Sequence, residues 1–162
     1  MTTLATRPSR VGDLARRASS PMAFAAALSL SAAIAHLDGI GVHARSWWAY
    51  GAFFLVTGVL QATLAVLLLY RPRAWLAFIA IPGNLAIIGM YVYTRTNGPP
   101  LGPHAGAPES PELLGMTTCA AELAVVVILL RLLGERTGRA MLWGILLLGL
   151  AAWALRLHGT LL

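Results

Sequence analysis

Three polar side chains lie deep inside apolar stretches of this 162-residue chain, where a polar group is costly and needs a reason to be present. They are Gln61, Asn84 and Glu122. A carboxyl group beside two amides can hold helices together through hydrogen bonds. It can also exchange a proton or bind a small ligand. The sequence leaves both interpretations open, interhelical hydrogen bonding and a proton-relay or small-ligand site.

Helical spacing adds a fourth polar group to these three. On the first apolar stretch, a stripe of small residues leads to His36: Ala25, Ser29 and Ala32. Small residues beside polar ones mark close contact between helices in membranes. The three polar residues named above also fall near the middle of their own stretches, so all three should lie at similar depth. The sequence therefore predicts one ligand or proton site formed by Gln61, Asn84, Glu122 and His36.

The histidines suggest a second chemistry, because all four fall at or near one end of the predicted helices: His36, His43, His104 and His158. Imidazole nitrogens and carboxylate oxygens are ligands for zinc, copper or iron. We therefore predict a metal ion held by His36, Asp38 and His104. The spacing matches no established metal signature, and an isolated histidine at a membrane surface commonly just places its polar end in water. Haem is less expected, because only His36 faces inward.

The common catalytic signatures are missing from the chain. It contains no phosphate-binding loop, no GxSxG, no HExxH and no dinucleotide-binding glycine pattern. Its single cysteine, Cys119, lies in an apolar stretch and belongs to no CxxC motif. We assign no catalytic residue, and the sequence favours a protein that is not an enzyme.

Composition indicates the elements that position these residues. The chain is 58% hydrophobic and only 11% charged, against about 25% charged in ordinary soluble domains. Five stretches have the length that a membrane helix needs, about 20 residues: 21–41, 47–70, 74–94, 113–133 and 140–157. Short connections make neighbouring helices antiparallel. The predicted fold is an all-α integral membrane helix bundle with five transmembrane helices, whose partner is the lipid bilayer and not nucleic acid.

The N-terminal residues 1–20 are rich in arginine and predict a cytoplasmic segment ahead of a transmembrane domain over residues 21–162. A rival interpretation is a cleaved signal peptide. A basic leader, an apolar stretch from Pro21 to Ile34 and the small residues Ala33 and Ala35 fit that pattern. The other four helices keep their orientation under either interpretation.

All twelve basic residues are arginines, and their placement predicts the orientation. Three groups fall on one side of the predicted bundle: residues 7–17, 71–73 and 131–139. Because cytoplasmic loops are enriched in basic residues, this side should be cytoplasmic. The prediction is a protein of the bacterial plasma membrane with its N-terminus cytoplasmic, its C-terminus external and the 95–112 loop outside. This loop, rich in proline and glycine, is either a recognition element or a passive lid.

The stretch Arg95-Thr-Asn-Gly-Pro-Pro-Leu-Gly-Pro-His-Ala-Gly106, with Asn84 before it and Glu122 after it, resembles a loop of small membrane proteins of high-GC bacteria. The resemblance spans residues 31–130 and implies no activity. Two classes of function remain open. One is a membrane protein that handles a proton, a metal ion or a small molecule from the outer face. The other is a non-catalytic accessory subunit of a larger membrane complex, with other subunits or a second copy of the chain as its partners.

Overall fold

The computed structural model describes residues 10–157 and 159 of the chain, with side chains for residues 20–155 and 159. Five helices make up the described part, which contains no strand: α1 (Arg10–Ser46), α2 (Trp48–Tyr70), α3 (Ala74–Asn97), α4 (Leu113–Leu132) and α5 (Glu135–Leu157). All five are long and apolar enough to cross a membrane. The predicted all-α bundle of five membrane-length helices is therefore confirmed.

Three helices extend beyond the predicted bounds. Helix α1 begins at Arg10 and not at residue 21, although its stretch of membrane length is Ser20–Ser46. Helix α3 continues past residue 94 to Asn97, and α5 begins at Glu135, five residues before the prediction. Hydrophobicity marks the part of a helix that lies in lipid, but the backbone hydrogen bonds continue into polar flanks until a residue stops them. After α3 that residue is Gly98, which takes a φ of 79°.

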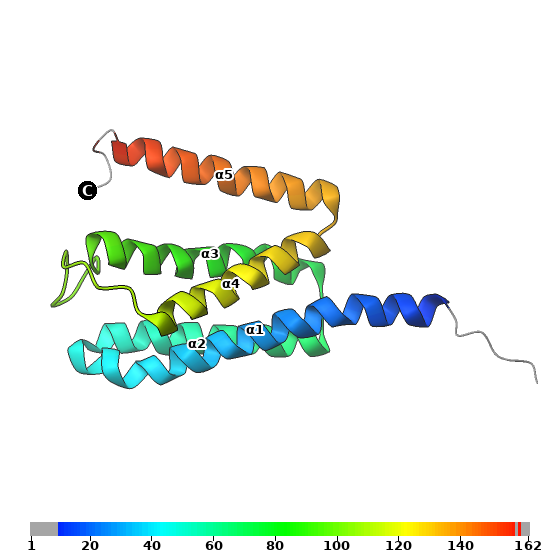
Figure 1. Cartoon of the computed structure of the whole chain (residues 1–162), viewed down its shortest axis with the longest axis horizontal. Coiled ribbons are helices and arrows are strands. Elements are labelled where there is room, and N and C mark those ends of the chain that lie inside the picture. The colour runs from blue at the N-terminus through cyan, green and yellow to red at the C-terminus, as the bar shows by residue number, and fades with distance from the viewer. Residues whose placement is uncertain (1–9, 158, 160–162) are drawn as a thin grey trace, which may run out of the picture.

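The helices form a bundle in which α1 and α4 are central (Figure 1). Helix α1 packs along α2 and α4, and α3 packs on the other side of α4. Helices α2 and α3 are joined by a short turn but have few contacts with each other. Helix α5 contacts α4 alone among the described helices, and none of its membrane-length stretch is buried. The apolar sequence of this helix has no polar stripe, which predicts a peripheral position, and the structure agrees.

Glycines on α2 explain how closely α1 and α2 approach. A β-carbon added to Gly51 would lie 2.5 Å from the Cβ of Ala44, and one added to Gly58 would lie 2.7 Å from Leu37. At Gly51 the close atoms include the backbone of α1, so only glycine fits there, whereas at Gly58 a β-carbon would require the end of the Leu37 side chain to move. The short distance between the axes of α1 and α2 brings the polar residue Gln61, one turn after Gly58, against α1.

Packing differs between the two ends of the bundle. At the end that carries the α2–α3 turn, aliphatic and small side chains form a dense core that includes Leu68, Ile81, Val125 and Leu129, all 4% exposed or less. At the opposite end, aromatic and aliphatic side chains and a few polar ones line a cavity between the helices. Large apolar side chains cover the outside of the bundle, as expected for helices that face lipid.

Candidate functional site

The four side chains of the predicted site meet in the centre of the bundle. Gln61 Nε2 donates to Asn84 Oδ1 at 2.9 Å and to Glu122 Oε1 at 3.2 Å. His36 Nε2 lies 2.9 Å from the same Glu122 Oε1. The four residues come from α1, α2, α3 and α4, so one hydrogen-bonded cluster joins all four packed helices. The predicted contact is confirmed; its role in binding stays a proposal.

Ser29 is a fifth member that the sequence analysis counted only as a small residue. Its hydroxyl lies 2.7 Å from Gln61 Oε1 and 2.8 Å from the Gln61 carbonyl oxygen, and it donates its single proton to this pair of acceptors. Asn84 Nδ2 donates to the carbonyl oxygen of Ala80 in its own helix, at 2.8 Å. The signal that could have identified Ser29 is its position two helical turns before His36, on the same face.

Glu122 uses only one of its two oxygens within this cluster. The residue is 0% exposed, and Oε1 faces both His36 and Gln61. Oε2 is buried and has no hydrogen-bond partner among the described residues. Because two bare acceptors would repel each other, one proton must lie between His36 Nε2 and Glu122 Oε1. The pair can therefore hold and transfer a proton, and Oε2 remains able to bond to something else.

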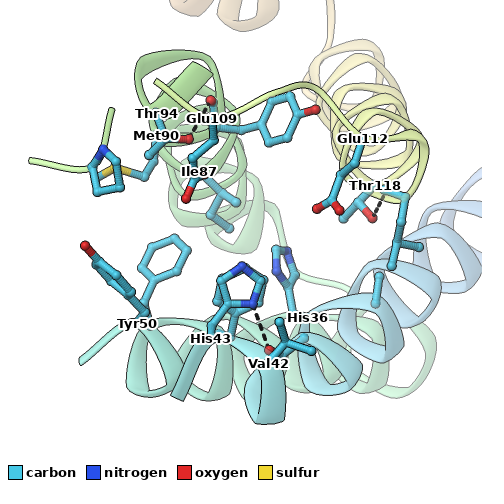
Figure 2. A pocket seen from close by; sticks show the side chains of 18 of the residues that line it. His36, Val42, His43, Tyr50, Ile87, Met90, Thr94, Glu109, Glu112 and Thr118 are labelled. Carbon is cyan, nitrogen blue, oxygen red and sulfur yellow. Dashed lines mark hydrogen bonds between the residues drawn. The ribbon is translucent and has the colours of Figure 1, made fainter. Parts of the chain in front are cut away.

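A cavity of about 470 Å³ reaches from this pair to the end of the bundle opposite the dense core. Figure 2 shows His36 and His43 projecting into it from one side, with Ile87 of α3 and Thr118 of α4 on facing walls. Aromatic side chains form much of the remaining wall: Trp47, Tyr50, Phe53, Phe54 and Tyr91. The His43 ring stacks on the Phe54 ring with 3.9 Å between centroids. The cavity is therefore largely apolar, with Glu122 and His36 at its deep end.

Arg95 closes part of the cavity mouth, a role that the sequence did not indicate. The sequence places Arg95 at the start of the external loop, but α3 continues through it and its side chain is only 13% exposed. The guanidinium lies 4.5 Å above the ring of Tyr91 and forms ion pairs with Glu109 and, at 3.8 Å, with Glu112. An arginine between two acidic residues thus joins α3 to the end of the loop.

The 98–112 loop folds back over the same end of the bundle. Tyr50 Oη donates to the carbonyl oxygen of Leu101 at 2.7 Å, and Glu109 N donates to the carbonyl oxygen of Thr94 at 3.2 Å. Pro99, Pro100 and Leu101 line the cavity. The loop is therefore a wall of the cavity as well as a cover for it.

The predicted metal ligands are not brought together. No group of three or more His, Cys, Asp or Glu side chains is placed to hold a metal ion among the described residues. His36 is turned to Glu122, while Asp38 and His104 are exposed, and His43 Nδ1 donates to the carbonyl oxygen of Gly39 at 2.8 Å. Asp38 is two residues after His36, so helical geometry places the two side chains on different faces. His158 lies outside the described residues.

Comparison with known proteins gives no match to a family model, to a curated protein or to a solved structure. The resemblance of the 95–106 stretch to small bacterial membrane proteins thus remains a prediction.

Proposed function

We propose that this chain is a multi-pass protein of the bacterial plasma membrane that binds a small molecule from the outer face. The observation that carries the proposal is the cavity ending on Glu122, a fully buried carboxyl group with one oxygen that has no partner in the described part of the chain. Leaving a buried polar atom without a partner costs about 1–3 kcal/mol, more if it is charged. A ligand that bonds to Oε2 removes that cost.

The size and lining of the cavity support small-molecule binding. Ligand sites commonly have volumes of about 300–1,000 Å³, mostly apolar walls and a few converging polar groups. This cavity has about 470 Å³, aromatic walls and the Glu122–His36 pair. Both its size and its lining fit that description.

The dense core favours binding over passage through the membrane. Between Glu122 and the end that carries the α2–α3 turn, the core is densely packed: Ile81, Val125 and Leu129 are only 0–2% exposed. This packing leaves no space for water or ions. The hydrogen-bond chain itself ends at the carbonyl oxygen of Ala80. A ligand or proton that reaches Glu122 from the cavity must therefore leave by the same route.

The orientation follows from the arginines. The turns at the densely packed end carry Arg71 and Arg73 between α2 and α3, and Arg136 and Arg139 at the start of α5. Because cytoplasmic segments are enriched in arginine, this end faces the cytoplasm and the cavity opens outward. The N-terminus is then cytoplasmic and the C-terminus external.

The proposal is tested by blocking the cavity with a matched pair of substitutions. Thr118 lines the cavity, whereas its neighbour Thr117 is exposed on the outer surface of α4, and each hydroxyl donates to a backbone carbonyl oxygen of α4. Thr118→Phe fills the cavity, and Thr117→Phe adds the same ring to the lipid face. Mass spectrometry of molecules extracted from the purified proteins should find a small molecule with the wild type and Thr117→Phe only. The same molecules on all three proteins would contradict the proposal.

One observation favours the alternative function, a non-catalytic accessory subunit. Helix α5 is held by α4 alone among the described helices and has no buried residue in its membrane-length stretch, so its surface is free for another membrane protein or a second copy. Chemical crosslinking in intact membranes from a residue on α5, such as Leu147, which is 63% exposed, would test it. A single specific crosslinked product would support the accessory role.

A further inference from the structure

We infer that the ligand of this cavity is a small organic cation, an amine with an apolar body, and that its ammonium group binds Glu122. The inference rests on the proposed function and adds the chemical class of the ligand. It combines three observations: the charges that surround the cavity, the free oxygen at its deep end and the aromatic walls.

The charges around the cavity are mostly negative, although the chain as a whole carries a net charge of +6. Four of its six acidic residues line the cavity: Asp38, Glu109, Glu112 and Glu122. Arg95 is the only arginine among the described lining residues, and it is already paired with two of these acids. Asp38 and Glu122 are the two acids that Arg95 does not pair, and the only other basic side chains among the described cavity-lining residues are His36 and His43. A cation is therefore attracted to this cavity and an anion is repelled.

At the deep end of the cavity, one oxygen of Glu122 lacks a hydrogen-bond donor among the described residues. Glu122 Oε1 already shares a proton with His36 Nε2 at 2.9 Å and accepts a hydrogen bond from Gln61 Nε2 at 3.2 Å. Oε2 is buried and has no partner among the described residues. An ammonium group supplies the missing donor together with a compensating charge, and such charge-assisted bonds are roughly twice as strong as neutral ones. A neutral alcohol supplies a donor without the charge.

The side walls of the cavity suit both the charge and the apolar body of an organic amine. The faces of Trp, Tyr and Phe rings attract cations within about 6 Å, and five such rings line the cavity. Arg95 already lies 4.5 Å above the Tyr91 ring, so one cation is held on an aromatic face at the mouth. Ile87, Met90 and Leu114 provide apolar surface for a hydrocarbon body.

A metal ion fits the same cavity less well. Zinc needs about four protein or water ligands at close range, and calcium needs six to eight oxygens. No group of three or more His, Cys, Asp or Glu side chains in the described part of the chain is arranged for this. A single buried carboxyl with aromatic walls matches an ammonium group better than a metal ion.

The native cysteine allows a direct test. Cys119 is the only cysteine of the chain and lines the cavity, so a bound molecule should shield it from a small thiol reagent. The rate of Cys119 modification is measured in the full-length protein with phenylbutylamine, phenylbutanol or phenylbutyrate present. These three probes share an apolar body and end in a cation, a neutral donor and an anion. Thermal unfolding followed by tryptophan fluorescence is recorded in parallel, so that the result does not depend on thiol reactivity alone.

Phenylbutylamine should protect Cys119 and stabilise the protein at concentrations about tenfold lower than phenylbutanol, with phenylbutyrate weaker still. Glu122→Gln should abolish this preference, whereas Glu122→Asp, which keeps the charge, should retain part of it. Equal protection by amine and alcohol, or stronger protection by the acid, would overturn the cation assignment and leave small-molecule binding standing. If no probe protects or stabilises the wild type, both the assignment and the proposed function fail. The comparison of probes on the wild type decides the matter even if a variant does not fold.

Discussion

At the residue scale, the two oxygens of Glu122 differ in their surroundings, and under the proposed function they serve the two roles that the sequence left as alternatives. Its Oε1 is hydrogen-bonded to both His36 of α1 and Gln61 of α2, which makes it part of the contact that holds the helices together. Its Oε2 is buried without a partner in the described structure and belongs to the cavity. Under the proposed function, packing and binding therefore depend on different atoms of one carboxyl group, and substitutions can test the two roles separately.

Glu122→Leu should destabilise the fold, and Glu122→Gln should not. Leucine leaves the donors of His36 and Gln61 buried without an acceptor, at a cost of about 1–3 kcal/mol. Glutamine keeps an amide oxygen in the place of Oε1, so the loss should stay below about 1 kcal/mol. Denaturant-induced unfolding in detergent measures both free energies. Equal loss of stability in the two variants would show that the negative charge, and not the hydrogen bonding, holds the cluster.

At the scale of the elements, the contact between α1 and α2 depends on the absence of side chains. Gly51→Ala should destabilise the protein by about 1–3 kcal/mol, because the new β-carbon meets the backbone and Cβ of Ala44 at 2.5–3.2 Å. Gly89→Ala is the matched control. It lies inside α3 with nothing within 4 Å of the new atom, so the better helix propensity of alanine should leave stability unchanged or raise it by up to about 1 kcal/mol. The two unfolding free energies, compared in one detergent, test the packing; equal values would refute it.

The ion pairs of Arg95 connect two elements, the end of α3 and the loop. Glu109→Gln should loosen this connection by less than about 1 kcal/mol, since Glu109 is 40% exposed. The fraction of molecules in which the 98–112 loop has moved away from the cavity then rises by up to about fivefold. Because Cys119 lines that cavity, a thiol reagent should modify it faster by the same factor. Glu135→Gln is the control, because it removes an exposed partner of Arg139 at the other end of the bundle. Unchanged labelling in Glu109→Gln would show that the loop opens without breaking this pair.

At the scale of the whole molecule, the bundle is dense at one end and hollow at the other, and the arginines indicate which end faces which compartment. In a Cys119→Ser background, Ala105→Cys should be labelled by an impermeant thiol reagent added outside intact cells. Pro72→Cys, in the exposed turn between α2 and α3, should be labelled only after the cells are opened. This pattern follows from the enrichment of arginine in cytoplasmic segments. The reverse pattern would turn the cavity toward the cytoplasm.

The sequence alone determined the elements and one long-range contact. A single apolar segment that spans a bilayer forms a helix, because its backbone polar groups must be hydrogen-bonded within the segment. Length and hydrophobicity were therefore sufficient to find five helices. Gln61, Asn84 and Glu122 could be placed together because a helix has a constant rise per residue, so position in the segment gives depth. Small residues beside His36 then indicated which face of α1 was inward.

Only the tertiary structure decided how these helices are rotated and what the loop does. The cavity lies between helices whose arrangement is set by tertiary packing, since α2 and α3 have few contacts with each other and pack instead on α1 and α4. Arg95 turns inward because two acids from the far end of the loop reach it, and these contacts lie 14 and 17 residues away in sequence (109 − 95 and 112 − 95). The predicted metal ligands His36, Asp38 and His104 lie apart for two different reasons. Helical geometry, which the sequence alone implies, puts His36 and Asp38 on different faces of α1. The exposed position of His104 depends on how the 98–112 loop folds back over the bundle, and no local pattern encodes such contacts between distant segments.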